Sequence, residues 1–459
     1  MNATTRLVDI VNRSLDGPVV EERTFDLTHV AQGVQQVVSD HEIKANPDNI
    51  VNLDDDMADR VWEAAVDLFA TCGVFSKDTG RVIMFDRDEI EQIVRDAPSE
   101  VTIGEGPDER TEMSRTLDDP RPPLLMGGPI GSPTPNELFV PITRSYVQEP
   151  IVDVTCAPTL TTIAGQEVRT KSPLEILAGW EEAKLTAEAR RLAGRPGIGT
   201  TGIMISISDL ANLSATSSGY VLPRDMHTFG IISELKTNNE IFNKLAHTVL
   251  MGGIVDPFAN PIYGGLGGGV EGVAVLLTAE MIALSVVFMA TCCGSSPTHP
   301  FHFHSTAPEI MRATSLSFQA LARNARLLTN LTCSPVGGPG TKTVLYEAIA
   351  YAAMSTVSGA SRILGPRSAT GVIAAHFSGL EARLMGEAAH AATKLTREEA
   401  EAIVQTSVSK WEHLQDQQPY GLSFPEVYNV ETVQPTDEWL GMYEEVKEEA
   451  IGWGLPLDS

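Results

Sequence analysis

One short stretch, "RDMHT", carries side chains that could perform acid–base chemistry: Asp225 and His227. An imidazole titrates near neutral pH, so His227 could protonate a leaving group, with Asp225 beside it. A lone histidine is more often structural, and the spacing alone does not separate the two interpretations. We therefore keep both residues as catalytic candidates.

A second stretch, "HPFHFHST", could support metal chemistry. If it forms a strand, His302 and His304 point to the same face, as some zinc sites require. The alternative is that Phe301 and Phe303 face the core while the histidines face a polar layer. No spacing identifies a third ligand, so we expect no metal site.

The glycine run "YGGLGGGVEG", which begins at Tyr263, is too irregular for a dinucleotide fingerprint. Glycine allows the backbone to approach a ligand closely, but the run could equally form a tight turn between a strand and a helix. Glu271, near its end, is either a buried acid or a charge in the first turn of a helix. We favour the helix position, because a carboxylate there is stabilised by the helix dipole.

The elements that would position these residues alternate between short apolar strands and amphipathic helices from about residue 150 onward. One helix has clear limits, with Ser172 as its N-cap, Pro173 at its first position and Gly194 after its end. Repeated strand–helix units predict an α/β fold, a TIM (β/α)8 barrel whose active site lies where strands end in loops. The expected strands lie in "IVDVTCAPTL", "GIGTTGIMIS", "GGIVDPFANP", "HPFHFHST" and "LTCSPVGG".

We expect three parts in the chain. Residues 1–120 form an acidic, helical N-terminal extension, residues 121–390 form the barrel, and residues 391–459 form a C-terminal helical extension. The Pro- and Gly-rich segment 118–137 reads as a long ordered loop or a junction. Thr396 and Glu399 form a capping box that starts a C-terminal helix.

The composition excludes some partners. The 459 residues carry a net charge of −27, which repels nucleic acid and anionic membrane. Five scattered cysteines predict a reduced, cytoplasmic protein without a disulfide framework. The apolar run 272–293 contains Glu280 and lacks flanking basic residues, so we interpret it as a buried helix leading toward a core strand, not as a membrane span.

Several long stretches resemble the monomethylamine methyltransferase family. They include "GGPIGSPTPNELFVPITRSY", "AGRPGIG", "NPIYGGLGGGVEG" and "SGLEARLMGEAAHAAT". The resemblance implies a TIM barrel with helical additions and a symmetric homo-oligomer, a hexamer. It also implies transfer of a methyl group from a small methylated amine to the cobalt of a separate, cognate corrinoid protein. On that basis we expect no tightly bound cofactor in this chain.

The resemblance also implies that the catalytic groups differ. The family's pyrrolysine position is Thr201 here, its acid beside the amine is Phe258, its second pocket acid is Thr228, and its pocket amide is Thr332. Asp225, His227, Tyr263 and Glu271 keep the family pattern. The catalytic candidates are therefore Thr201, His227 and Asp225. The candidate substrate-binding residues are Phe258, Tyr263, Thr332, Met204, Thr228, Glu271, His302 and His304.

These replacements favour a methyltransferase that works without pyrrolysine on a quaternary or otherwise activated amine. Aromatic faces hold quaternary cations well, and Phe258, Tyr263, Phe301 and Phe303 are candidate walls. Alternatively, Phe258 only fills space that pyrrolysine leaves. Two other functions stay open: a barrel enzyme with metal-assisted or acid–base lyase or hydrolase chemistry, and a catalytically silent homologue that binds a ligand.

Overall fold

A parallel barrel forms the centre of the molecule. The computed structural model describes residues 2–201 and 208–457, and within them eight parallel strands share one sheet. The last strand pairs with the first, Gly365 opposite Gly127, and β11 contacts β12. The predicted (β/α)8 barrel is confirmed. The strands are β5 (Leu124–Gly127), β7 (Val154–Cys156), β11 (Gly199–Thr201), β12 (Met226–Gly230), β14 (Ile254–Ala259), β15 (Cys292–Ser295), β16 (Leu328–Thr332) and β17 (Arg362–Gly365).

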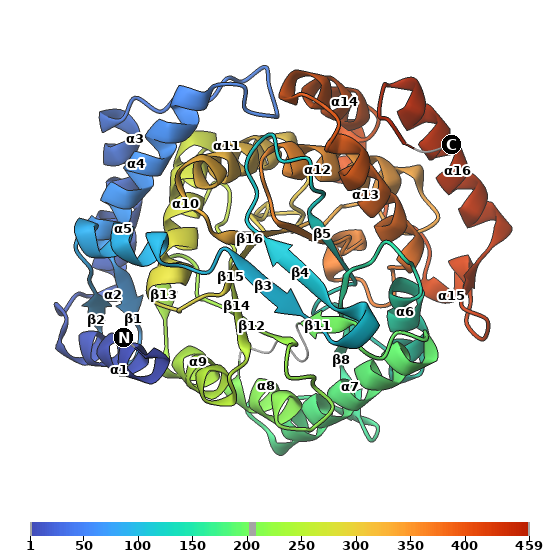
Figure 1. Ribbon diagram of the computed structural model, residues 1–459, viewed down its shortest axis with the longest axis horizontal. Helices are drawn as coiled ribbons and strands as arrows, with labels where there is room; N and C mark the ends of the chain where they lie inside the picture. The colour runs from blue at the N-terminus through green and yellow to red at the C-terminus, as the bar shows by residue number, and fades with distance from the viewer. Residues whose placement is uncertain (1, 202–207, 458–459) are drawn as a thin grey trace.

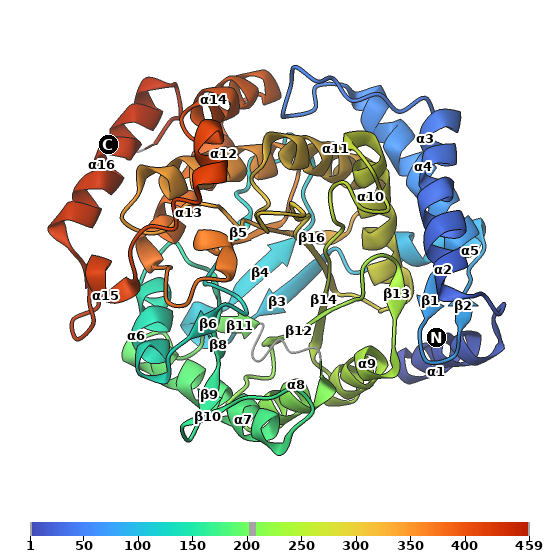
Figure 2. The same ribbon diagram turned by 180° about the vertical axis from the view of Figure 1, so that it is seen from behind.

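A ring of helices surrounds the strands (Figures 1 and 2), and each strand is followed by one of them. They are α6 (Asn136–Val147), α7 (Pro173–Leu192), α8 (Asp209–Thr216), α9 (Asn239–Met251), α10 (Val270–Val286), α11 (Pro308–Asn324), α12 (Lys342–Val357) and α13 (Gly379–Ala392). Helix α10 is mostly apolar and is buried from Gly272 to Val286, because α4 (Asp55–Cys72) covers it from outside and α11 flanks it. None of the described helices is long and apolar enough to cross a bilayer.

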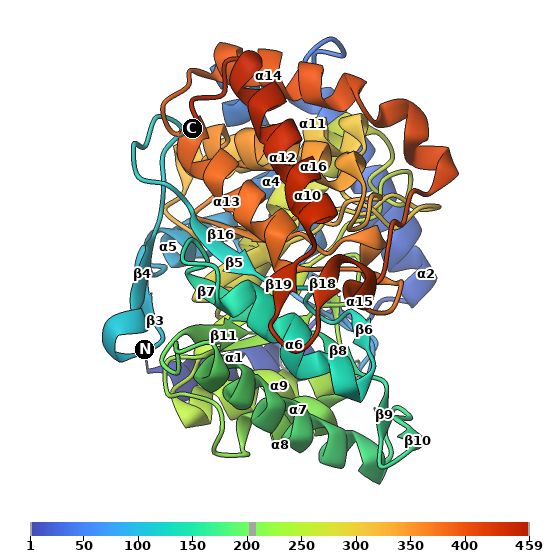
Figure 3. The same cartoon turned by 90° about the vertical axis from the view of Figure 1, so that its right-hand side faces the viewer.

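Helices from the two ends of the chain cover the ring on different sides. On the N-terminal side, α1 (Ala3–Asp16) contacts α9, and α3 (Gly33–Asp40) and α5 (Arg87–Arg95) pack against α4. On the C-terminal side, α14 (Arg397–Ser409) packs on α12. Helix α16 (Asp437–Gly452) runs along α12 and α13 (Figure 3), beyond the short α15 (Phe424–Val427). The additions therefore stabilise the barrel from outside.

A hairpin closes the amino-terminal end of the barrel. Strands β3 (Glu100–Ile103) and β4 (Arg110–Met113) cross this end in front of the other strands (Figure 1). The Gly104 amide donates to the Arg224 carbonyl just before β12, at 3.1 Å. Glu112 of β4 enters the barrel and is fully buried. Side chains that meet a ligand must therefore lie at the opposite, carboxyl end.

Several local predictions are confirmed. Ser172 caps α7, with its hydroxyl accepting from the Leu174 amide at 3.3 Å, and Thr396 and Glu399 form the expected capping box. The run 272–293 forms the buried α10 and enters β15. All five cysteines lie in the described part of the chain, are buried and carry free thiols.

Two local predictions are wrong, one of a strand and one of a loop. "HPFHFHST" is a loop, in which the His299 amide donates to the His304 carbonyl at 2.9 Å, and the strand of this unit is the earlier β15. The alternation misled because Phe301 and Phe303 face solvent, at 77% and 58% exposure. The segment 118–137 is not merely a loop, because it contains the first barrel strand, β5. This strand has only four residues and lies between Pro and Gly clusters, so the sequence pattern did not predict it.

Candidate active site

A cavity of about 260 Å³ opens at the carboxyl ends of the barrel strands, where barrel enzymes place their active sites. Its volume suits a small organic molecule. Three of its lining side chains, Thr228, Phe258 and Thr332, are among the candidates that the sequence predicts. The described residues that line it are Ile130, Gly131, Thr228, Gly230, Phe258, Asn260, Ser296, Thr332 and Arg367.

Phe258 forms an aromatic wall of this cavity. It lies on β14 opposite Gly294 of β15, and its side chain is 7% exposed. A Cβ atom at position 294 would lie 2.5–2.6 Å from three atoms of the Phe258 ring. Glycine at 294 is therefore required for the ring to lie across the neighbouring strand.

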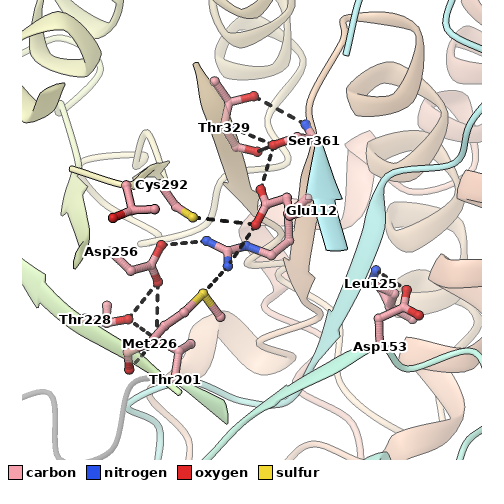
Figure 4. A network of polar contacts seen from close by, with 12 residues as sticks. Glu112, Leu125, Asp153, Thr201, Met226, Thr228, Asp256, Cys292, Thr329 and Ser361 are labelled. Carbon is pink, nitrogen blue, oxygen red and sulfur yellow. Dashed lines mark hydrogen bonds and ion pairs between the residues drawn. The ribbon is translucent and has the colours of Figure 1, made fainter. Parts of the chain in front are cut away.

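Below the cavity, two threonines bind a buried carboxylate. Thr228 donates to Oδ2 of Asp256 at 2.8 Å, and Thr201 donates to the same oxygen at 3.2 Å. The two hydroxyls also contact each other. Figure 4 shows both threonines pointing toward Asp256 from neighbouring strands. Thr201 thus belongs to the floor beneath the cavity, where its hydroxyl positions Thr228.

The Asp256 carboxylate is neutralised by a fully buried arginine. Nη2 of Arg362 lies 2.5 Å from Oδ1 of Asp256, and Nη1 lies 3.3 Å from Oε2 of Glu112. Ser361 donates to Oε1 of Glu112 at 2.6 Å, and the Cys292 thiol contacts Oε2 (Figure 4). The three charged side chains thus form one closed network in the barrel interior.

Burial and charge act in opposite directions on this network. Burial lowers the pKa of the Arg362 guanidinium, but Asp256 and then Glu112 outweigh it, so the pKa lies above its ordinary value. Burial raises the pKa of Glu112, and Arg362 offsets part of that shift. Arg362 stays charged, and its ion pair with Asp256 keeps that carboxylate within the network. The cavity floor therefore presents threonine hydroxyls, not a free carboxylate.

Comparisons with known proteins agree with this architecture. A family model described as Monomethylamine methyltransferase MtmB matches residues 5–455. Monomethylamine methyltransferase MtmB2 from Methanosarcina barkeri is 31% identical over 405 residues, 88% of each chain. MtmB2 from Methanosarcina acetivorans is 29% identical over 447 residues, 97% of each chain. The chain belongs to the monomethylamine methyltransferase family.

The family assignment extends to the three-dimensional structure. The crystal structure of Methanosarcina barkeri monomethylamine methyltransferase superposes with a TM-score of 0.95 at 28% identity, covering 98% of both chains. Members of the family are methyltransferases, and this chain is assigned to that enzyme class. Four residues at which the resemblance implies replaced catalytic groups lie together in the cavity wall and its floor: Thr201, Thr228, Phe258 and Thr332.

The structure places His227 and Asp225 outside the cavity. His227 lies on the outer face of β12, where Nδ1 is 3.3 Å from the Thr248 hydroxyl of α9 and the ring packs near His247. Burial lowers its pKa to about 4. Asp225 pairs with Arg190 at 3.1 Å and accepts from the Thr200 amide at 2.8 Å. Both residues hold helices and strands together and do not reach the site.

The predicted histidine pair also lies apart from the cavity lining. Since the segment is a loop, the argument that His302 and His304 share a strand face fails. His302 pairs with Asp416 at 3.1 Å, and His304 is buried with Nδ1 3.1 Å from the Thr306 hydroxyl. Within residues 2–201 and 208–457, no group of three or more His, Cys, Asp or Glu side chains is placed to hold a metal ion.

The other three substrate-binding candidates, Tyr263, Glu271 and Met204, are not among the described residues that line the cavity. Tyr263 is partly buried against the main core and is not among the described lining residues. Glu271 lies in the first turn of α10, as the helix interpretation expected, and accepts from the Ala45 amide at 3.2 Å. It does not line the cavity. Met204 lies outside the described residues.

Sequence reasoning missed the charged residues of the site. Asp256 precedes Phe258 by two positions on one strand, so period-2 alternation places both on the inner face. Arg362 is a charge at the first position of a short, otherwise apolar strand, "RILG", which signals a buried ion pair. Glu112 gave no local signal, because only the hairpin's position across the barrel brings it to Arg362. Arg367 lies two positions after the end of β17 and could have been found once that strand was recognised.

Proposed function

We propose that this chain moves a methyl group from a small quaternary ammonium, or a donor activated to a similar degree, to the cobalt of a separate corrinoid protein, without pyrrolysine. The observation that carries the proposal is the cavity wall. Where the resemblance implies an acid beside the amine, Phe258 presents an aromatic ring, and the neighbouring lining positions carry Thr228 and Thr332. As part of the same proposal, the corrinoid belongs to a cognate partner protein and this chain forms a homo-oligomer.

The chemistry of the leaving group supports a quaternary donor. When cobalt(I) attacks the methyl carbon, the carbon–nitrogen bond breaks and its electron pair stays on nitrogen. A quaternary ammonium then departs as a neutral tertiary amine and needs no proton. A neutral amine would need protonation, yet the described lining side chains offer hydroxyls, an amide and a guanidinium, none of which is a general acid at neutral pH.

The aromatic wall supplies the matching recognition. A quaternary ammonium has no N–H group to donate, but it is attracted to the face of an aromatic ring by roughly 0.5–2 kcal/mol. One side of the Phe258 ring packs against the backbone at Gly294, which leaves the space that the ring needs. Thr228 and Thr332 leave room for methyl groups where larger polar side chains would occupy it.

The test is a methyl-transfer assay with purified protein, a reduced corrinoid protein, and a panel of mono-, di-, tri- and tetra-substituted amines and sulfoniums. Methylation is followed by the absorbance of the corrinoid. The proposal predicts transfer from at least one quaternary or sulfonium donor and none from monomethylamine. Transfer from monomethylamine alone would overturn it.

A matched pair of variants tests the role of the wall. Phe258→Leu removes the aromatic face and keeps an apolar side chain, while Phe301→Leu makes the same change on a residue that is 77% exposed. In a calorimetric binding assay, we expect affinity for the transferring cation to fall about 2- to 30-fold in the first variant, the range of one cation–π contact. The second variant should bind like the unmodified protein.

A further inference from the structure

Arg367 is the charged side chain of the cavity wall. The other described lining residues are apolar or uncharged, and the sequence of the undescribed segment 202–207 contains no charged residue. No carboxylate among the described residues lies within 4.0 Å of the Arg367 guanidinium. The proposed cationic donor would therefore meet a positive charge in a site that offers it no opposite charge.

The guanidinium is held in position by uncharged partners. Nε donates to the Ile130 carbonyl at 2.9 Å, and Nη1 donates to the Ser334 hydroxyl at 3.3 Å. Nη2 packs against Gly371, where an added Cβ would lie 2.6 Å away. An arginine carries five N–H donors, so these bonds fix the plane of the group and leave donors for a ligand.

The fully buried Arg362 and the half-buried Arg367 differ in their charged neighbours. Arg362 has Asp256 and Glu112 beside it, which hold its pKa above the ordinary value. Burial lowers the pKa of Arg367, because no carboxylate near the group compensates for the loss of water. An arginine that has only uncharged protein partners and faces a cavity can bind an anionic group of a ligand.

The aromatic wall and the guanidinium of the cavity lie on different barrel strands. Phe258 lies on β14, and Arg367 follows β17, three strands further around the barrel in the order β14–β15–β16–β17. Ser296, just after β15, and Thr332, at the end of β16, also line the cavity. One small molecule could therefore place a cation against the ring and an anion against the guanidinium.

We propose that the methyl donor is a zwitterion, a quaternary ammonium or sulfonium that also carries a carboxylate, with Phe258 facing its cationic end and Arg367 binding its carboxylate. This inference rests on the proposed function and narrows its substrate class. The transfer step is unchanged: the methyl–nitrogen or methyl–sulfur bond breaks, the electron pair stays on the leaving atom, and the carboxylate stays bound to Arg367 throughout.

The test compares glycine betaine with its carboxamide, which has the same shape and the same ammonium group but no negative charge. Binding to the full chain is measured by calorimetry without any corrinoid protein. We expect the zwitterion to bind about 10- to 100-fold more tightly, the range of a charge-assisted arginine–carboxylate contact. Equal affinity for the two compounds, or tighter binding of the carboxamide, would overturn the inference.

Variants separate recognition from a structural role. Arg367→Gln should abolish the preference for the zwitterion while leaving carboxamide binding within about 3-fold, and Arg367→Lys should keep part of the preference. Arg169→Gln, a change on a side chain that is 79% exposed, serves as the control. If Arg367→Gln weakens both compounds equally, the residue only supports the fold and the inference fails. The ratio of the affinities of the unmodified protein for glycine betaine and for its carboxamide tests the carboxylate preference without any mutation.

These outcomes are distinguishable from failure of the proposed function. If cationic donors transfer methyl groups but show no carboxylate preference, the zwitterion inference fails and the proposed function stands. If the zwitterion binds through Arg367 but no donor methylates the corrinoid, the proposed function fails and the anion-binding role of Arg367 stands.

Discussion

Replacing Arg362 by methionine should strongly destabilise the barrel, by an amount that depends on pH. The guanidinium is fully buried, 2.5 Å from Asp256 and 3.3 Å from Glu112. Methionine leaves both carboxyl groups buried without a cation. Breaking a buried pair in this way costs about 3–5 kcal/mol of unfolding free energy.

A second estimate gives a similar number. A buried carboxyl group without its cation takes up a proton, at a cost of about 1.4 kcal/mol for each pH unit above its ordinary pKa of about 4. One such group costs about 4 kcal/mol at pH 7 and about 1.4 kcal/mol at pH 5. In the variant the folded-state pKa lies above the unfolded one, so this destabilisation is absent below the unfolded pKa and grows as pH rises.

The assay is guanidinium chloride unfolding of the purified protein at pH 7 and pH 5, followed by circular dichroism and tryptophan fluorescence. Arg169→Met, on an exposed side chain, is the control. The combined variant with Arg362→Met, Asp256→Asn and Glu112→Gln should be more stable than Arg362→Met alone, because this network then contains no ionisable side chain. An Arg362→Met variant as stable as the unmodified protein at pH 7, or a cost equal at both pH values, would refute the reasoning.

Three further changes test the site and its surroundings. Gly294→Ala should displace the Phe258 ring, since the new Cβ would lie 2.5–2.6 Å from it, and should weaken calorimetric binding of a quaternary cation at least as much as Phe258→Leu; unchanged binding would contradict the packing. His227→Gln should leave the methyl-transfer rate within about 2-fold, since the ring faces α9; a loss above 100-fold would restore it as the general acid. Because burial lowers the pKa of His227 to about 4, the unfolded state binds a proton that the folded state does not between about pH 6.5 and 4. The unmodified protein therefore loses stability as pH falls through this range, and the His227→Gln variant should lose less of it in acid unfolding. Burial raises the pKa of Glu280 well above its ordinary value, so stability falls as pH rises past about 4.5, and Glu280→Gln should flatten that fall in thermal unfolding between pH 5 and 8; an unchanged slope would argue against a buried acid there.

Long periodic segments made the barrel predictable. Ser172 and Gly194 mark the two ends of helix α7. The long apolar run of α10 could be assigned to a buried helix because it contains Glu280 and lacks flanking basic residues. The barrel strands are only three to six residues long in the described chain, so their patterns are weak. Strand β5 lies between prolines and glycines, which predicted a loop. The alternating Phe301 and Phe303 predicted a strand, although both side chains are exposed and the chain forms a loop there.

The site was predictable only where residues share a strand or a family position. Phe258, Thr228 and Thr332 came from the resemblance, and the cavity brings them together. Glu112 and Arg362 are 250 positions apart in sequence and meet because a hairpin closes the barrel end. His227 was misjudged because a strand has two faces, and without the register of β12 the outer face cannot be told from the inner one.

The central claim is that this chain methylates a corrinoid protein from a cationic donor and does so without pyrrolysine. The most direct measurement is the absorbance change of a reduced corrinoid protein mixed with this chain and either glycine betaine or monomethylamine. The proposed chemistry predicts methylated corrinoid from glycine betaine, dependent on Phe258 and Arg367, and none from monomethylamine. Methylation from monomethylamine with none from glycine betaine would contradict it.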